Sequence, residues 1–406
     1  MSGRFAAFRH SSYQRYFGAR FCAAFAAQIL SVSVAWQMYD ETRSAALLGW
    51  IGLVQFLPAL CLVVFTGLAA DRFGRRLVMG LTIILEMACA VTILFMAVLQ
   101  KFDPILVLAT LTVFGCARAF LAPASSSLAV NIVPKEDFAN AAGFSALSWQ
   151  TASIVGPVAG GLLYGVSGPV AYGASAVLFS IAGVLIFSIP KPAQRSHAPA
   201  TNLSTLLGGF QYIWRQKVVL GAISLDLFAV LLGGAIALLP IYARDILGLE
   251  ASGLGLLRSA QGIGAVIMIG IITAFPIRNH AGKILFVSVG FFGLSTAIFG
   301  FSTVAWLSIL MLMLIGAFDM VSVYIREILL QLWTPDEVRG RVNAVNSIFL
   351  GASNELGEAR AGFMAAFLGP VITVVGGGIA AIGIAAGWAF LFPKIRKTNQ
   401  LHVPED

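Results

Sequence analysis

Twelve apolar stretches, each long enough to cross a lipid bilayer as a helix, dominate the sequence. A helix needs roughly 20 mainly apolar residues to span the hydrocarbon core. Only 11% of the residues are charged, whereas soluble domains contain about 25%, so a water-soluble globule is excluded. The sequence therefore predicts an all-α membrane protein with twelve transmembrane helices. Their approximate limits are 17–39, 45–70, 77–99, 104–131, 139–166, 169–189, 218–243, 252–275, 283–301, 304–332, 341–368 and 371–392.

The lysines and arginines outside these stretches lie almost entirely on one side of the membrane. The N-terminus, the loops that follow even-numbered helices and the C-terminus contain 18 of them, and the opposite loops contain only Arg43, Lys101 and Arg244. Cytoplasmic loops hold lysine and arginine in excess. We therefore expect a multi-pass protein of the inner cell membrane with both termini in the cytoplasm. Because these loops explain the net charge of +8, the charge does not indicate nucleic-acid binding.

The longest polar segment, 190–217, divides the chain near its middle, with six predicted helices on each side. We expect an N-terminal six-helix bundle at 1–189 and a cytoplasmic linker at 190–217. A C-terminal six-helix bundle with a short cytoplasmic tail is expected at 218–406. The sequence thus predicts two domains joined by a single connection.

The two halves also resemble each other at an offset of 201 residues. A polar Pro-Lys-Glu-Asp segment at 134–137 precedes the fifth helix, and Pro-Asp-Glu at 335–337 precedes the eleventh. With the same offset, Gly156 corresponds to Gly357. Parallel duplication of a six-helix unit is typical of one class of secondary transporter, in which substrate binds near the membrane midplane. Coincidence among glycine-rich helices is the alternative.

A polar motif, GLAADRFGRR at 67–76, lies in the turn between the second and third predicted helices. Glycines permit a tight turn, the aspartate suits a helix N-terminus, and the arginines can bind carboxylates or phosphates. The motif resembles the G-x-x-x-D-R-x-G-R-R loop signature of the major facilitator superfamily, in which this loop controls the conformational change. The matching residues are Gly67, Asp71, Arg72, Gly74, Arg75 and Arg76. The second half keeps only Gly282 and Lys283, with no aspartate.

A motif of small residues lies on the fifth predicted helix. It consists of Gly143, Gly156, Pro157, Gly160 and Gly161. Small residues allow close helix contact, and a proline loosens the helix. The motif is similar to the superfamily's antiporter motif, which occurs mostly in exporters, although Ala152 stands where a glycine is expected. Plain helix packing is the alternative reason for this pattern.

Three further segments, at 36–49, 115–128 and 339–362, are similar to the enterobactin-exporter type of bacterial facilitator, which is related to macrolide and multidrug efflux pumps. The similarity extends over essentially the whole chain. It implies the major facilitator fold, with two pseudo-symmetric six-helix bundles. It also implies proton-driven export of a small organic molecule, siderophore or drug-like, without identifying that molecule.

Ionisable residues inside the predicted helices are the candidates for proton coupling, because each is costly in a membrane unless it is paired or hydrated. Counting 1.5 Å per residue from the cytoplasmic helix ends, Arg118 and Asp319 lie at similar depth near mid-membrane. They also differ by 201 in number, and the family resemblance places their helices around the central cavity. We therefore expect Asp319 to carry the coupling proton beside Arg118. Glu327, Asp226 and Glu355 are the reserve candidates.

The same depth count suggests two further pairs. Asp226 matches Arg326 nearer the cytoplasm, and Arg258 matches Glu358 on the other side of mid-membrane. Inert structural ion pairs are the alternative interpretation of all three pairs. We interpret Glu86 as an interfacial or structural residue.

The remaining features limit the class of protein. No Walker motif appears in the sequence, so an ion gradient is the expected energy source, and neither a cofactor nor a metal is expected. Gln28, Gln37 and Gln261 offer polar groups for cargo, or for hydrogen bonds between helices. The sequence predicts a monomeric, non-enzymatic transporter that exchanges a small hydrophobic or amphiphilic molecule for protons across the lipid bilayer. An importer or lipid-like substrate flippase of the same fold, and a membrane sensor or scaffold that moves nothing, are the alternatives.

Overall fold

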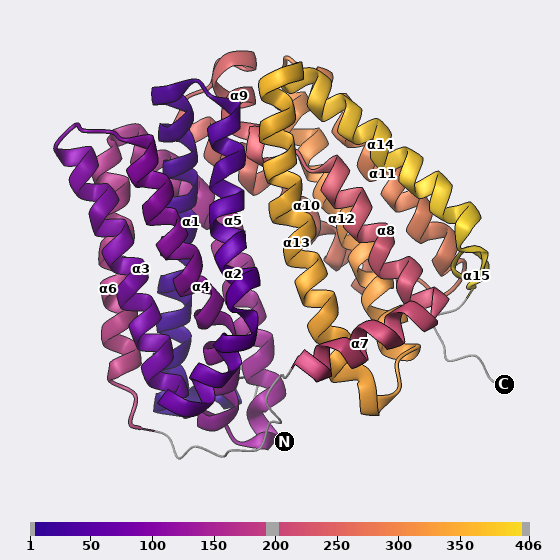
Figure 1. The fold of residues 1–406 in the computed structure, drawn as a ribbon, viewed down its shortest axis with the longest axis horizontal. Helices are drawn as coiled ribbons and strands as arrows, with labels where there is room; N and C mark the ends of the chain where they lie inside the picture. Colours follow the sequence, from indigo (N-terminus) through magenta and orange to yellow (C-terminus); the bar gives the residue numbers. More distant parts are fainter. Residues whose placement is uncertain (1–4, 192–202, 400–406) are drawn as a thin grey trace. The chain divides into compact units, whose positions relative to one another are not determined.

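The structure, a computed structural model, describes residues 5–191 and 203–399, and the regular elements in these ranges are all helical. Six long helices precede position 191 and six follow position 203 (Figure 1). The first six are α1 (Ser11–Thr42), α2 (Ala45–Phe73), α3 (Arg75–Val98), α4 (Pro104–Ile132), α5 (Phe138–Val166) and α6 (Gly168–Phe187). The second six are α8 (Lys217–Gly233), α10 (Ala251–Ala274), α11 (Ala281–Phe301), α12 (Ala305–Leu332), α13 (Asp336–Leu368) and α14 (Pro370–Leu391).

Several shorter helices connect or extend the long ones. They are η1 (Ala6–Arg9), η2 (Lys135–Asp137), α7 (Leu203–Arg215), η3 (Ile236–Leu238), α9 (Leu239–Ile241), η4 (Tyr242–Ile246) and α15 (Pro393–Lys397). Ten helical segments among the described residues are long and apolar enough to cross a membrane. The two predicted spans that are not among these ten are the fifth and the eleventh. They correspond to α5 and α13, which have 29 and 33 residues. At 1.5 Å per residue both exceed the roughly 30 Å of a hydrocarbon core.

Local sequence explains where the chain turns between helices. Asp103 caps α4, because its side chain accepts hydrogen bonds from the amides of Ile105 and Leu106 at 2.9 and 3.4 Å. Gly74 separates α2 from α3 with φ of 93°, and Gly369 separates α13 from α14 with φ of 82°. These backbone conformations are accessible to glycine without strain. The chain therefore reverses direction between long helices through very short connections.

The chain forms two compact units. The first contains Met1–Arg43, Val54–Thr201 and Leu249–Ser259, and the second contains Ser44–Leu53, Asn202–Gly248 and Ala260–Asp406. The start of α2 is thus grouped with the second unit and the start of α10 with the first. The sequence predicts each domain as one continuous segment, and these limits stay a prediction. In the structure, the starts of α2 and α10 are exchanged between the two compact units.

Glycines explain the exchange of helix ends. Within the second unit, a Cβ atom at Gly49 would lie 2.8 Å from the carbonyl oxygen of Ala359, and one at Gly362 would lie 2.4 Å from the amide nitrogen of Gly49. Within the first unit, a Cβ atom at Gly161 would lie 2.4 Å from the carbonyl oxygen of Ala251. Small residues let helix backbones approach this closely in membranes. Each exchanged end is therefore held by backbone-to-backbone contact.

The seventh predicted span is not one continuous helix. The sequence predicts a single helix over 218–243, but α8 ends at Gly233 and the chain continues through η3, α9 and η4 to Ile246. Gly234 is extended, with φ of −61° and ψ of 128°. Two successive glycines carry no side chain that would favour helix, and Pro240 lacks an amide proton. The expectation of an uninterrupted helix is therefore wrong at 234–235, although Lys217–Ile246 as a whole is one candidate membrane span.

The predicted linker, 190–217, includes residues 192–202, which lie outside the described residues. Its second half contains α7, which packs on α13 and the end of α12. The hydroxyl of Tyr212 donates to the carbonyl oxygen of Trp333 at 2.6 Å, and the rings of Phe210 and Phe349 lie 5.5 Å apart. This part of the linker is therefore an ordered helix of the second unit.

Candidate functional site

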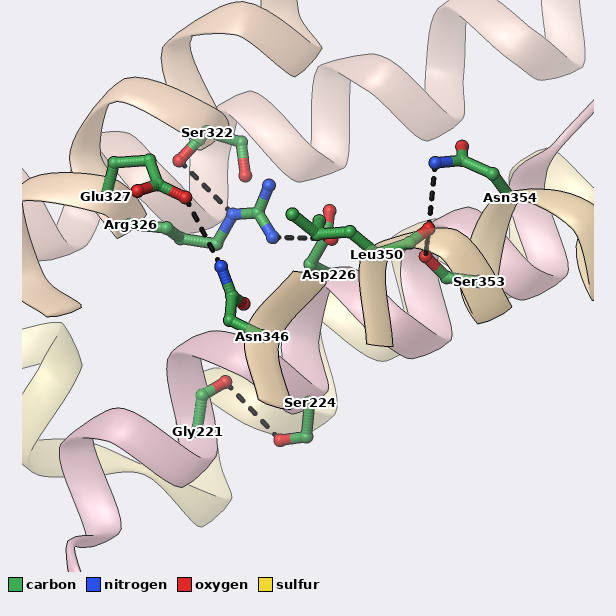
Figure 2. A network of polar contacts seen from close by, with 10 residues as sticks. All are labelled: Gly221, Ser224, Asp226, Ser322, Arg326, Glu327, Asn346, Leu350, Ser353 and Asn354. Carbon is green, nitrogen blue, oxygen red and sulfur yellow. Dashed lines mark hydrogen bonds and ion pairs between the residues drawn. The ribbon is translucent and has the colours of Figure 1, made fainter. Parts of the chain in front are cut away.

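An ion pair is buried in the second unit between α8 and α12. A guanidinium nitrogen of Arg326 lies 2.7 Å from a carboxylate oxygen of Asp226, and both side chains are only 7% exposed (Figure 2). The Nε of Arg326 also donates to the carbonyl oxygen of Ser322 at 3.3 Å. Charges this deeply buried require such partners, because removal from water costs several kcal/mol per ion. The contact between Asp226 and Arg326 that helix depth predicted is confirmed.

A second polar contact connects the same region to α13. The side-chain amide of Asn346 donates to a carboxylate oxygen of Glu327 at 3.3 Å (Figure 2). Glu327 directly follows Arg326 in the sequence. Asn346 is itself buried. Three helices, α8, α12 and α13, are thus joined by polar groups inside the second unit.

A cavity of about 240 Å³ lies beside this network, also inside the second unit. The interrupted end of α8, residues 233–236, forms part of its wall. Its polar lining comes from α10, α11, α12 and α13. These residues are Gln261, Thr296, Asp319, Asn354 and Glu358. Val230, Phe292 and Ile315 supply apolar surface, so the wall is suited to an amphiphilic molecule.

A much smaller space, about 10 Å³, connects this cavity to the ion pair. It is lined by Asp226, Ser322 and Asp319, and it shares Val230, Phe292 and Asp319 with the larger cavity. Its volume is close to the minimum that one water molecule requires. Asp226 repels the Asp319 carboxylate and Arg326 attracts it. Asp319 therefore lies where the larger cavity meets the ion pair.

The other predicted pairs join residues of different units. Arg118 and Arg258 belong to the first unit, while Asp319 and Glu358 belong to the second, so both pairings stay predictions. Within the first unit, Arg258 donates to the hydroxyl of Ser31 at 2.9 Å.

Glu355, a reserve candidate, faces α2 within the second unit. A Cβ atom placed on Gly52 would lie 3.5 Å from a carboxylate oxygen of Glu355. Glu355 does not line the cavity described above, whereas Glu358, one turn later, does. Of these two glutamates, Glu358 is therefore the one placed to meet a bound molecule.

Glu86 is a buried carboxylate whose environment was not predicted. It lies in the middle of α3 and is 1% exposed, and its Oε2 atom has no hydrogen-bond partner in the part of the chain that the structure describes. Arg118 of α4 attracts it electrostatically. Of the two interpretations given for Glu86, interfacial or structural, the interfacial one is therefore wrong and the structural one stays. Its position halfway along an apolar stretch was the sequence signal that could have indicated burial.

The comparison with protein families decides the fold family. The family model of the Major Facilitator Superfamily matches residues 16–319, well over half of the chain. The chain belongs to the major facilitator superfamily. The family resemblance drawn from the loop motif is thus confirmed, and members of this superfamily are transporters rather than enzymes.

The chain is also similar over nearly its full length to curated members of the superfamily. It is 24% identical over 401 residues to the enterobactin exporter EntS of Shigella boydii serotype 4 (strain Sb227), with 96% of this chain and 94% of the relative covered. EntS of Escherichia coli O81 (strain ED1a) is 24% identical over 405 residues, with the same coverage. The chain is therefore similar to an enterobactin exporter over nearly its whole length.

Two solved structures of major facilitator proteins have the same fold. A bacterial homolog of the human lysosomal transporter Spinster, in an inward-facing and unoccupied conformation, has a TM-score of 0.75 at 14% identity, with 96% of this chain and 99% of that chain covered. A POT family transporter in complex with 5-aminolevulinic acid has a TM-score of 0.73 at 13% identity, with 98% of both chains covered. The predicted fold, twelve helices in two six-helix bundles, is confirmed.

The loop motif of the superfamily binds helix ends within the first unit. Arg75 donates to the carbonyl oxygen of Ser127 at 3.1 Å and to Asn131 at 2.9 Å, both near the end of α4. Arg76 donates to the carbonyl oxygen of Ile189, just after α6. Cations stabilise helix C-termini by satisfying free carbonyl groups. The motif arginines therefore brace the N-terminal bundle.

The structure describes the other residues of the loop motif in less detail. Arg72 is exposed, and its guanidinium lies 5.7 Å from the ring centre of Phe73. Gly67 and Asp71 lie on α2, but the surroundings of both residues are outside the described part of the structure. The role of Asp71 in the conformational change stays a prediction.

The small-residue motif of α5 produces close helix packing. A Cβ atom at Gly156 would lie 2.6 Å from the Cβ of Gln28, and one at Gly160 would lie 3.0 Å from the Cα of Ile29, both on α1. Gly161 contacts the start of α10, and the carbonyl oxygen of Pro157 would lie 2.3 Å from a Cβ at Gly255. Gly143 has open space around it. The packing role is therefore present, and a role in antiport stays a prediction.

The three glutamines differ in their surroundings. Gln28 packs against Gly156, and Gln37 accepts a hydrogen bond from the hydroxyl of Tyr172 at 2.6 Å. Gln261 lines the cavity of the second unit. Among them, only the position of Gln261 suits contact with cargo in that cavity.

Proposed function

We propose that this chain is a proton-coupled exporter of a small amphiphilic molecule, siderophore-like or drug-like, and that it works as a monomer by alternating access. The observation that carries the proposal is the position of Asp319 between the cavity and the buried Asp226–Arg326 pair. End-to-end similarity to an enterobactin exporter supports the direction of transport and the class of cargo.

The cavity suits cargo with both polar and apolar groups. Gln261, Asn354 and Glu358 offer hydrogen-bonding groups, while Phe292 and Ile315 offer apolar contact. Pockets for drug-sized ligands usually measure about 300–1,000 Å³. At about 240 Å³, this cavity accommodates a small cargo or one group of a larger one.

Coupling follows from the charges around Asp319. When Asp319 is deprotonated, it is repelled by Asp226 and competes with Asp226 for Arg326. When Asp319 is protonated, Arg326 pairs with Asp226 alone, and the α8–α12 contact is strongest. Cargo entering the cavity contacts Asp319 and changes the free energy of its protonation. Arg118, the residue that corresponds to Asp319 in the first half, would attract the deprotonated carboxylate during the cycle.

The proposed orientation places both termini in the cytoplasm of an inner membrane. The 18 lysines and arginines in the loops and termini of one side support this orientation. In this orientation, protons enter from outside while cargo leaves the cytoplasm. Asp71 and Arg75 would then lie at the cytoplasmic face and control the closing of the two halves there.

The test is the Asp319→Asn variant reconstituted in proteoliposomes with an imposed pH gradient. An asparagine cannot exchange a proton, so we expect loss of uphill transport of a labelled catecholate siderophore, macrolide or cationic dye. Substrate binding and downhill exchange should persist, which distinguishes uncoupling from misfolding. Glu250→Gln, which changes an exposed carboxylate, should transport normally. Uphill transport with normal proton flux in Asp319→Asn would refute the assignment, and Asp226, Glu327, Glu355 and Glu358 would be tested next.

A further inference from the structure

A basic pocket lies where α11 begins and the chain leaves α15. Its volume is about 350 Å³. Six residues line it, namely His280, Lys283, Arg396, Lys397, Thr398 and Asn399. None of the six is acidic, and none belongs to the cavity beside Asp319.

Backbone hydrogen bonds fix the shape of this pocket. The amides of Ala281 and Gly282 donate to the carbonyl oxygens of Asn399 and Thr398 at 3.2 and 3.0 Å. The amide of His280 donates to the side-chain oxygen of Asn399 at 2.9 Å. A Cβ atom at Gly282 would lie 1.8 Å from the carbonyl oxygen of Ile395, so only glycine permits this approach. The segment after α15 is therefore held firmly across the start of α11.

The pocket concentrates positive charge, and the described residues supply no counterion to it. Within residues 5–191 and 203–399, no ion pair involves Lys283, Arg396 or Lys397. The guanidinium of Arg396 lies 5.9 Å from the ring centre of Phe390, which orients it. Three cations around one concave space repel each other unless an anion binds between them. The pocket is thus chemically suited to a phosphate group, which accepts hydrogen bonds from arginine and lysine.

The position of the pocket distinguishes a lipid phosphate from a soluble one. The candidate spans α11 and α14 begin and end beside the pocket, at Ala281 and Leu391, and the ends of membrane-spanning helices lie near the depth of lipid headgroups. Large apolar side chains are exposed next to it. Phe390 is 76% exposed and Leu391 is 68% exposed. A lipid could therefore place its phosphate in the pocket and its acyl chains along these side chains.

We propose that the pocket of Lys283, Arg396 and Lys397 binds the phosphate of an anionic phospholipid, with the acyl chains lying against Phe390 and Leu391. The bound phosphate neutralises the three cations and holds α15 against α11. Basic pockets at the cytoplasmic ends of membrane helices bind anionic headgroups in this way. The site is independent of the transported molecule and of proton coupling.

The test measures binding of a short-chain phosphatidylglycerol to the full, delipidated chain in detergent by titration calorimetry. Each cation near an anionic lipid contributes about 1 kcal/mol, so Lys283→Gln/Arg396→Gln should bind about thirty-fold more weakly. The matched control is Arg278→Gln/Lys394→Gln, which removes two exposed charges close by that do not line the pocket. The control variant should bind like the unaltered chain.

Two further arms decide the source of the phosphate and the role of folding. Inorganic phosphate and phosphatidylcholine should neither bind at matched concentration nor compete with phosphatidylglycerol. Equal binding of inorganic phosphate would overturn the lipid assignment in favour of a soluble anion. Equal weakening in the control variant would overturn the pocket in favour of diffuse surface charge. Lys283→Arg/Arg396→Lys keeps both charges, so it should retain binding, and its failure to bind while correctly folded would also contradict the proposal.

Discussion

The two units differ in whether their buried charged side chains are paired. In the second unit, Asp226 and Arg326 form a close ion pair beside a cavity. In the first unit, Glu86 is buried with one oxygen atom that lacks a hydrogen-bond partner among the described residues. At the repeat offset of 201, the positions of Asp226 and Arg326 are occupied by Phe25 and Ser125. The ion pair is therefore present in only one copy of the duplicated fold.

In the first unit, the position that corresponds to Arg326 carries a neutral serine, Ser125, which contacts Tyr16, and Arg20 donates to the same Tyr16 hydroxyl at 3.2 Å. The hydroxyls of Ser125 and Tyr16 lie 2.9 Å apart, and that of Tyr16 also bonds the carbonyl oxygen of Ser125 at 3.0 Å. A six-helix unit of this family therefore needs no ion pair at these positions in order to fold. Under the proposed function, the second unit keeps its buried charges for coupling, and loss of either partner alone costs stability.

The largest expected effect is that of Arg326→Leu. This variant leaves Asp226 buried without its partner, which should cost about 3–5 kcal/mol of stability and abolish transport. Thermal unfolding in detergent measures the loss. The double variant Asp226→Asn/Arg326→Leu should recover most of the stability without recovering transport. Equal stability of the single and double variants would remove the basis for the comparison between units.

The next effect concerns the loop motif, which is complete only in the first half. Asp71→Asn should leave the protein in the membrane but slow transport strongly, because the aspartate is needed to close the cytoplasmic face. Initial rates in proteoliposomes, with Glu136→Gln as an exposed carboxylate control, measure this change. Unchanged transport in Asp71→Asn would mean that the motif has no gating role here.

A smaller effect of opposite sign is expected at Glu86. Glu86→Met removes a buried carboxylate with an unsatisfied oxygen, so it should stabilise the chain by about 1–3 kcal/mol. Coupled transport should persist, in contrast to Asp319→Asn. A loss of proton-driven transport in Glu86→Met would show that the first unit also carries a coupling group, and the two units would then be functionally similar.

The smallest effect is expected at the neutral counterpart of the ion pair. Tyr16→Phe removes the hydrogen bonds to Ser125 and the one accepted from Arg20, and should cost about 0.5–1.5 kcal/mol, with transport unchanged. The same unfolding measurement as for Arg326→Leu allows direct comparison. If Tyr16→Phe is as damaging as Arg326→Leu, the neutral contact is as important as the charged one, and the contrast between the units disappears.

The helices and their approximate limits could be predicted from sequence because about 20 apolar residues in a row leave few other structures. The Asp226–Arg326 contact was also predictable, since helical rise converts residue number into depth. The break after Gly233 was not, because a glycine pair in an apolar stretch is equally compatible with close helix packing. The cavity around Asp319 depends on that break and on side chains from α10, α11, α12 and α13, so no single stretch of sequence contains it.

The exchanged helix ends also set the order in which the chain can complete its structure during synthesis. Gly49 is made early, but its backbone partner Gly362 leaves the ribosome about 300 residues later, roughly 15–60 s at about 5–20 residues per second. Until then the start of α2 lacks the surface against which it packs in the second unit. The N-terminal helices must therefore wait in the membrane partly assembled, and chaperones or the insertion machinery have this interval in which to protect them.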